Sequence, residues 1–297
     1  MIWLIGNKGM LGTELSLLLE KAGLPFIGSD KEVDITDPAA LIQFTLAYQG
    51  ERKIEWIINC AAYTAVDKAE DDGSLCSLLN TQGAANIAAA AKFCGATLVH
   101  ISTDYVFDGK GNRPYTEDDP TSPIGVYGLT KRDGEIKVFE ENPKSYILRT
   151  AWLYGRYWNN FVNTMLLLFK EREEVKVVND QYGSPTWTFD LSQAICNLIQ
   201  QIRDRKSIPF GIYHFTNEEI CTWFTFAKYI YDEGRALNIL TKPCEIKPCN
   251  SEEYPAKVKR PAYSVLDKTK IKRTLGLEIP EWKISLKNYL KLTMEQA

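Results

Sequence analysis

The sequence predicts an α/β fold in which residues 1–150 form a doubly wound parallel sheet of the Rossmann type, followed by a smaller C-terminal α/β domain. Strand-like and helix-like segments alternate through residues 1–150, and this alternation implies a parallel sheet covered by helices on both faces. A glycine-rich turn from Gly6 to Gly12 joins the first strand to the first helix. After residue 150 the alternation loosens, which indicates the second, smaller domain.

The elements of the first domain follow from the spacing of its apolar residues. Short apolar runs predict strands, and apolar residues at helical spacing predict helices. We expect strands at residues 2–5, 25–29, 56–59, 98–102 and 146–149, and helices at residues 11–22, 37–49, 67–79, 81–93 and 127–141. The fifth strand closes the regular alternation.

The second half has a less regular order of elements. Residues 175–178 look like a sixth strand of the sheet, and 213–216 like a further short strand. Helices are expected at residues 161–170, 191–202, 222–234, 268–275 and 286–292. We therefore assign residues 1–150 to a dinucleotide-binding domain that also uses about 172–205, and residues 151–297 mainly to a second domain interleaved with it.

Composition excludes several classes of protein. A net charge of −3 argues against general binding to a nucleic-acid backbone, which needs a basic face. No apolar run approaches the roughly 18 residues that a membrane helix needs, and Met1 leads into a strand without a basic signal-peptide region. Seven scattered cysteines without a CxxC pair, and only two histidines, argue against a disulfide framework and a His/Cys metal site. We expect a cytoplasmic protein.

The glycine-rich turn indicates a site for a dinucleotide. Gly6 allows the tight turn, Gly9 lets a pyrophosphate approach the backbone, and Gly12 lets the helix pack closely on the strand. The phosphates would then face the N-terminus of the helix. At the end of the second strand, an acidic residue favours NAD and a basic one NADP. Because Asp30 is followed by Lys31, the choice of cofactor stays open, as does a solvated loop role for both charges.

A Tyr-x-x-x-Lys pair at the start of the fifth helix indicates acid–base chemistry. Tyr127 and Lys131 lie four residues apart, so they share one face of the helix. An ammonium about 4 Å from a phenol, at an effective dielectric of about 20, favours the phenolate by roughly 4 kcal/mol, or about three pKa units. The fourth strand delivers Thr103 to the carboxyl edge of the sheet, where such sheets bind ligands.

These motifs resemble those of the extended short-chain dehydrogenase/reductases and, within them, the dTDP-4-dehydrorhamnose reductase family. Beside the glycine turn and Tyr127-x-x-x-Lys131, the resemblance is carried by residues 61–70, 101–107, 149–152, 159–161, 179–183 and 260–261. It implies an oxidoreductase in which NADPH or NADH reduces the C4 keto group of dTDP-4-dehydro-L-rhamnose. It further implies that Tyr127 donates the proton, Thr103 hydrogen-bonds the same oxygen, and Lys131 holds the nicotinamide ribose.

The resemblance also assigns ligand contacts. Residues expected to contact the cofactor are Gly6, Lys8, Gly9, Met10, Leu11, Asp30, Lys31, Asp34, Ile35, Ala61, Ala62, Tyr63, Asn80, Tyr127 and Lys131. Residues expected to contact the dTDP-sugar are Thr64, Val66, Thr103, Asp104, Tyr105, Phe107, Tyr127, Trp152, Asn159, Gln181, Pro185 and Arg260.

The sequence departs from the family pattern in two places. The tail block Arg-Pro-x-Asn-Ser has Tyr263 in place of its asparagine, which puts local contacts in doubt. Some members form a dimer through a magnesium site built from glutamates. Only Glu14 matches, and Asp190 stands near another position, so we predict no metal and leave monomer or homodimer open.

Two other functions remain open. A non-catalytic regulatory subunit, like that of methionine adenosyltransferase, keeps this fold and a dinucleotide site. A sugar-nucleotide epimerase or dehydratase is the other alternative. Dehydratases of the superfamily carry an acidic pair after the catalytic threonine, whereas here Thr103 is followed by Asp104 and Tyr105.

Replacing Gly9 tests the dinucleotide site. We expect Gly9→Val to crowd the pyrophosphate and weaken nucleotide binding at least tenfold, about 1.4 kcal/mol. Nucleotide affinity is measured by equilibrium titration, with circular dichroism to establish that the variant folds. A folded variant that binds as tightly as the unchanged chain would contradict the assignment.

Overall fold

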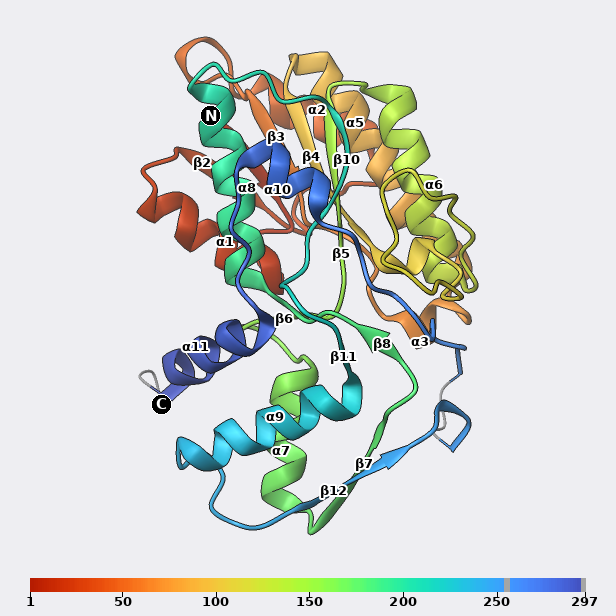
Figure 1. Cartoon of the computed structure of the whole chain (residues 1–297). Coiled ribbons are helices and arrows are strands. Elements are labelled where there is room, and N and C mark those ends of the chain that lie inside the picture. Colours follow the sequence, from red (N-terminus) through yellow and green to blue (C-terminus); the bar gives the residue numbers. More distant parts are fainter. Residues whose placement is uncertain (254–256, 295–297) are drawn as a thin grey trace.

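Six parallel strands form the main sheet, in the order β10-β5-β4-β3-β1-β2 (Figure 1). The structure is a computed structural model that describes residues 1–253 and 257–294. The strands are β1 Ile2–Ile5, β2 Phe26–Ser29, β3 Trp56–Asn59, β4 Thr97–Thr103, β5 Ser145–Thr150 and β10 Gly211–His214. Every neighbouring pair is parallel. The predicted α/β fold with a doubly wound parallel sheet is therefore confirmed.

Helices cover both faces of this sheet because its strands are apolar on both sides. On β1, Leu4 faces one core, and its neighbour Trp3 faces the other. The first core is closed by α1 Met10–Lys21, α8 Thr188–Arg203 and α10 Thr269–Leu275, and the second by α2 Pro38–Leu46, α5 Gly83–Cys94 and α6 Val126–Glu141 (Figure 1). No helix within the described ranges is long and apolar enough to cross a membrane.

The prediction that residues 175–178 form the sixth strand of this sheet is wrong. Strand β7, Glu174–Val178, pairs instead with β12, Glu245–Cys249, in a separate two-stranded sheet. The sixth strand is β10, which pairs with β5. In β7, Glu174 and Lys176 are exposed while Val175 and Val177 are buried, so the strand is covered on one side only. That alternation distinguishes it from a strand covered on both faces.

The second unit lies beyond the carboxyl edge of the main sheet, with β7 and β12 beside its helices (Figure 1). Its helices are α7 Phe161–Glu171, α9 Trp223–Ala236 and α11 Trp282–Met294, and its short strands are β6 Leu153–Tyr154, β8 Tyr182–Gly183, β9 Thr186–Trp187 and β11 Cys221–Thr222. They share a core that includes Phe169, Phe226 and Tyr289. From this packing we propose that the dinucleotide-binding domain takes in α8, β10 and α10, and the second domain the elements above.

The connection after β3 is more broken than the sequence suggests. Two helices were expected at 67–79 and 81–93, but the chain forms α3 Val66–Ala69, α4 Gly73–Ser77, a π-helical turn Leu78–Gln82 and then α5. Gly73 follows two aspartates, and these residues favour a helix boundary over a helix interior. The π-helical turn carries Asn80, which faces the loop after β3.

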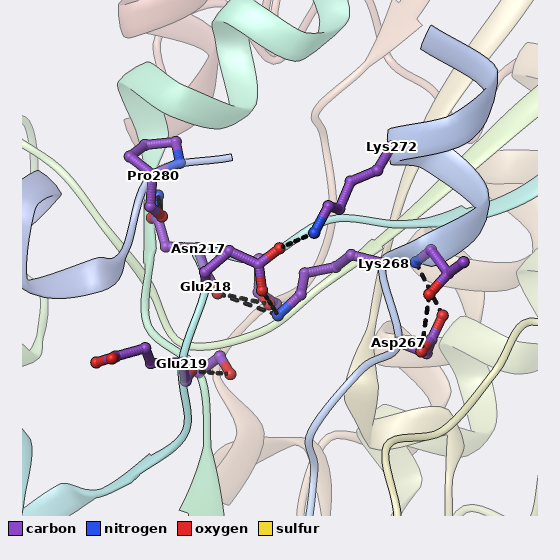
Figure 2. Close-up of polar contacts among 10 residues, drawn as sticks. Asn217, Glu218, Glu219, Asp267, Lys268, Lys272 and Pro280 are labelled. Carbon is purple, nitrogen blue, oxygen red and sulfur yellow. Dashed lines mark hydrogen bonds and ion pairs between the residues drawn. The ribbon is translucent and has the colours of Figure 1, made fainter. Parts of the chain in front are cut away.

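Polar contacts tie the C-terminal segments to the residues after β10, as Figure 2 shows. Lys268 is nearly buried, donates to the backbone carbonyl of Asn217 and lies 3.1 Å from Glu218, which also pairs with Lys272. The Asn217 amide donates to the Pro280 carbonyl at 3.2 Å and to buried Asp190 at 2.6 Å. These bonds hold α10 and the segment before α11 against the residues that follow β10 and, through Asp190, against α8.

Helix α1 packs closely against the glycine turn at Gly6, and this contact can be tested by its effect on stability. A Cβ at Gly12 would lie 2.1 Å from the Gly6 carbonyl oxygen, so the backbone would have to move. We expect Gly12→Ala to lower the free energy of unfolding by about 1–3 kcal/mol, as overpacking does. Urea unfolding measures it. Gly73→Ala is the matched control, because its Cβ would meet Val126 at an ordinary 3.7 Å. Equal destabilisation by both would contradict the packing argument.

Candidate active site

A cleft of about 770 Å³ lies at the carboxyl edge of the main sheet. Parallel sheets bind ligands at this edge. The predicted site residues that line it are Gly6, Gly9, Met10, Leu11, Asp30, Lys31, Asp34, Ile35, Ala61, Ala62, Thr64, Val66, Thr103, Asp104, Tyr105, Tyr127, Lys131 and Trp152. Thr150 and Ala151 also line it and were missed, although the end of the predicted fifth strand was a sufficient signal.

The glycine turn forms one end of this cleft. Gly6 has a φ of +76°, a conformation that glycine adopts readily, and a Cβ there would lie 2.7 Å from the Ala61 amide nitrogen. A Cβ at Gly9 would meet only the Gly6 carbonyl oxygen, at 3.3 Å, so the space above Gly9 is open. Because α1 begins at Met10, the free amides of its first turn adjoin that space. The turn therefore fits a pyrophosphate.

Four charged groups gather at the end of β2. Asp30 and Lys31 line the cleft. Glu32, which the sequence analysis missed, accepts from the Asp30 amide at 2.9 Å and pairs with Lys8 at 3.2 Å. Backbone hydrogen bonds, followed by Lys8, lower the pKa of Glu32. The position that distinguishes NAD from NADP thus carries two acidic and two basic side chains.

Asn80 fixes the backbone of the loop after β3 through two hydrogen bonds to Tyr63. Its amide oxygen accepts from the Tyr63 amide at 2.8 Å, and its amide nitrogen donates to the Tyr63 carbonyl at 3.1 Å. The Tyr63 hydroxyl donates to Asp72. Neither Asn80 nor Tyr63 lines the cleft, whereas Ala61 and Ala62 do. In this structure Asn80 holds the backbone that presents the small alanines.

Thr103 and Tyr127 both line the cleft. Thr103 ends β4, and Tyr127 lies in the first turn of α6. Burial raises the pKa of Tyr127, and the nearby Thr103 hydroxyl opposes that rise. The edge of the Tyr105 ring packs on the Tyr127 ring at 5.5 Å. A phenol that keeps its proton at neutral pH is in the form that a general acid needs.

The surroundings of Lys131 do not support the expectation that its ammonium lowers the pKa of Tyr127. Its ammonium donates to the Ile101 carbonyl at 2.6 Å and lies 3.4 Å from His100 Nε2. Burial lowers the pKa of Lys131 to about 8, while Glu135 raises it. Burial also lowers the pKa of His100, so the imidazole is neutral. In this arrangement burial is the main cause of the raised pKa of Tyr127, and the charge of Asp104 adds to it.

Asp104 is a buried carboxyl group beside the catalytic candidates. It accepts from the Thr103 hydroxyl at 2.9 Å, and its other oxygen has no hydrogen-bond partner within the part of the chain described. Burial raises its pKa to about 6, against the hydrogen bond from Thr103. Asp104 therefore titrates near neutral pH at the wall of the cleft.

Five residues expected to contact the sugar nucleotide lie outside the walls of the cleft, and three of them, Phe107, Pro185 and Asn159, also lie outside the cavity of the second unit. Phe107 is buried and stacks on Tyr115 at 4.3 Å. Pro185 is also buried, and its carbonyl accepts from the Asn217 amide. Asn159 is exposed and accepts from the Thr164 hydroxyl at 3.1 Å.

A second cavity of about 1150 Å³ lies in the second unit and holds Gln181 and Arg260. Gln181 donates to Ser251 at 2.8 Å, and Arg260 pairs with Asp67 of α3 at 3.2 Å. The Arg260 Nε is buried without a partner among the residues described. Trp152 lines the first cleft and stacks at 3.6 Å on Trp223, which lines this cavity. The stacked pair therefore stands between the two spaces.

Tyr263, which replaces the asparagine of the family's Arg-Pro-x-Asn-Ser block, is packed against neighbouring residues. Its amide donates to the Gly109 carbonyl at 3.0 Å, and its ring lies 6.3 Å from Tyr115. Ser264 donates through its backbone to the Tyr182 carbonyl. The tail block therefore joins the loop after β4 to β8.

The two acidic positions weighed for a metal have protein partners. Glu14 is buried and pairs with Arg156 at 3.1 Å. Asp190 accepts from Ser285 at 2.5 Å and from Asn217 at 2.6 Å. Residues 1–253 and 257–294 contain no group of three or more His, Cys, Asp and Glu side chains arranged to hold a metal.

Comparison with known proteins gives a match over nearly the whole chain. The family model described as "RmlD substrate binding domain" matches residues 1–294. The dTDP-4-dehydrorhamnose reductase of Streptomyces griseus is 42% identical over 288 residues, covering 96% of this chain and 91% of the relative. That of Aggregatibacter actinomycetemcomitans is 39% identical over 285 residues, covering 95% and 96%.

Solved structures give the same result. A dTDP-4-dehydrorhamnose reductase from Clostridium acetobutylicum superimposes with a TM-score of 0.89 at 42% identity, covering 99% of both chains. The reductase of Bacillus anthracis, solved in complex with NADP, has a TM-score of 0.89 at 38% identity and covers 97% of this chain and 98% of its own. A dTDP-glucose 4,6-dehydratase from Streptomyces venezuelae, at 18% identity and a TM-score of 0.77, shares the fold.

Proposed function

Because the chain belongs to the RmlD substrate binding domain family together with dTDP-4-dehydrorhamnose reductases, we propose that it reduces the C4 keto group of dTDP-4-dehydro-L-rhamnose to give dTDP-L-rhamnose. The observation that carries this is the convergence of Thr103, Tyr127 and the glycine turn on one cleft. The reaction consumes one NADPH or NADH and one proton for each keto group. The bound nicotinamide supplies the hydride; the protein supplies orientation and the proton.

The proton comes from Tyr127. Its hydroxyl gives a proton to the C4 oxygen as the alkoxide develops, and Thr103 donates a hydrogen bond to the same oxygen. We propose that Lys131 adds a positive charge beside Tyr127 and binds a ribose hydroxyl of the cofactor. Burial keeps water away from the Lys131 ammonium, which strengthens its interactions.

We propose that the cofactor and the sugar nucleotide bind in different parts of the site. We place the pyrophosphate of the cofactor at Gly6 and Gly9, where the backbone leaves open space. We place the nucleoside diphosphate of the substrate toward the second cavity, where Gln181 and Arg260 lie. The Arg260 guanidinium provides the positive charge, once it shares or leaves Asp67.

The alternative functions are favoured less by the same site. A regulatory subunit needs no general acid, yet Thr103 and Tyr127 both line the cleft. A dehydratase of this fold uses two acidic residues after the threonine. Only Asp104 is present, and Tyr105 packs its ring against Tyr127. Turnover of dTDP-4-dehydrorhamnose, followed by the absorbance of the nicotinamide cofactor, separates the reductase from both.

We also propose a cytoplasmic protein that is a monomer or a homodimer. All seven cysteines are free in the structure. Burial raises the pKa of Cys60 to about 12 and that of Cys196 to about 11, so both stay protonated and resist oxidation. Free thiols fit a reducing compartment.

Removing the phenol hydroxyl tests the general acid. We expect Tyr127→Phe to lower turnover by roughly 10²–10⁴-fold, which is the usual value of general acid catalysis, while cofactor affinity is kept. Lys131→Met should weaken cofactor binding and also slow turnover. Steady-state kinetics and a separate cofactor titration measure the two effects. A folded Tyr127→Phe enzyme with near-normal turnover would show that another group supplies the proton.

The mixed charges at the end of β2 lead to a prediction about the preference for NADPH or NADH. Since Asp30 and Glu32 oppose Lys8 and Lys31, we expect both NADPH and NADH to be used, with kcat/KM values within a hundredfold of each other, about 2.7 kcal/mol. The two values are measured side by side at one ionic strength. A larger preference would mean that one charged residue dominates.

A further inference from the structure

Helix α6 presents a third polar side chain to the sheet, two turns beyond Tyr127. Glu135 has an exposed fraction of 3%, and Arg149 of β5 has 2%. The Arg149 guanidinium donates to both Glu135 oxygens, at 2.9 Å and 2.6 Å. Ser102 of β4 donates to Glu135 Oε1 at 2.5 Å. A buried carboxylate with three such donors is fixed in place.

Glu135 and Lys131 attach α6 to consecutive residues of β4. Lys131 donates to the Ile101 carbonyl, and Glu135 accepts from Ser102, the residue before Thr103. Because Tyr127, Lys131 and Glu135 follow at intervals of four, they share one face of the helix. The position of Tyr127 relative to Thr103 therefore depends on both attachments.

The groups facing Lys131 come from every element packed around it. They are His100 of β4, Cys60 after β3, Cys76 of α4, and Tyr127 and Glu135 of α6, while Arg149 of β5 pairs with Glu135. Burial lowers the pKa of His100 and raises the pKa values of Cys60, Cys76 and Tyr127, so these four groups are neutral near pH 7. Glu135 is then the one carboxylate in this set, one helical turn from the ammonium, and Arg149 is its partner.

We propose that Glu135 is a positioning residue for the reduction, which fixes α6 on β4 through Ser102 and holds a negative charge one helical turn from the Lys131 ammonium. The inference rests on the proposed reductase function. Glu135 touches neither the cleft nor the reacting atoms and acts through Lys131 and Ser102. Arg149 makes the buried charge of Glu135 tolerable, since an unpaired carboxylate at this depth would be strongly destabilising.

The charge part of the proposal predicts a change in pH dependence. Burial lowers the pKa of Lys131 to about 8, and Glu135 opposes that effect. Activity that needs the ammonium is lost as pH rises through this value. Removing the negative charge lowers the pKa further, so the alkaline limb of kcat/KM should move down by about one pH unit or more.

The experiment compares the full-length wild type with Glu135→Gln, the double variant Glu135→Gln/Arg149→Met, and Ser102→Ala. The double variant removes both charges, and replacing a buried ion pair in this way is often neutral or stabilising. If the single variant fails to fold, the double variant and Ser102→Ala carry the test of the attachment through kcat. Ser102→Ala removes the attachment and keeps the charge. Thermal unfolding and cofactor titration accompany each pH profile.

The expected result is an alkaline limb that shifts down in Glu135→Gln, shifts less in the double variant because loss of the Arg149 cation opposes loss of the carboxylate, and stays unshifted in Ser102→Ala, which should lower kcat instead. A folded, active Glu135→Gln variant with the wild-type limb would overturn the proposal, as would an equal limb shift or an unchanged kcat in Ser102→Ala. A purely structural role of Glu135 would lower the unfolding temperature without moving the limb. Absence of turnover in the wild type would instead count against the reductase function itself.

Discussion

The common direction of the six strands in the main sheet places the ends of β1, β3, β4 and β5 on one edge. The glycine turn, the small alanines, Thr103 and Thr150 all occupy that edge because each follows or ends a strand. No single strand carries a site; the cleft exists only when the strands are paired in this order. Helix α6 then completes it by bringing Tyr127 to the end of β4.

Desolvation governs the chemistry of this edge more than proximity of charge does. It raises the pKa values of Tyr127 and Asp104 and lowers those of Lys131 and His100. In each case burial favours the neutral form of the group. A proton donor is thereby kept protonated, while a lysine that must stay charged depends on a carboxylate nearby. The expectation drawn from the Tyr-x-x-x-Lys spacing took account of the charge pair and left out burial.

The sequence predicted the parts of the molecule that local patterns determine. The glycine turn, the five strands of the first half and the residues at their carboxyl ends all follow from spacing along the chain. The sequence-based prediction failed where the position of a strand or side chain depends on a partner elsewhere in the chain. The apolar run of β7 was read as a strand of the main sheet, because an isolated segment does not reveal that β12 pairs with it. Glu135 and Glu32 were missed, since their partners lie on other elements or in the backbone of a turn.

The chain passes between the two units several times. It leaves the first after β5, returns for α8 and β10, leaves again for α9 and β12, returns for α10 and ends in α11. Neither unit is therefore a continuous segment that a single cut could release. Each core closes only when residues more than a hundred positions apart come together, as Leu15 and Ile271 do. Such distant contacts make folding slow, and they commit the two units to assemble as one.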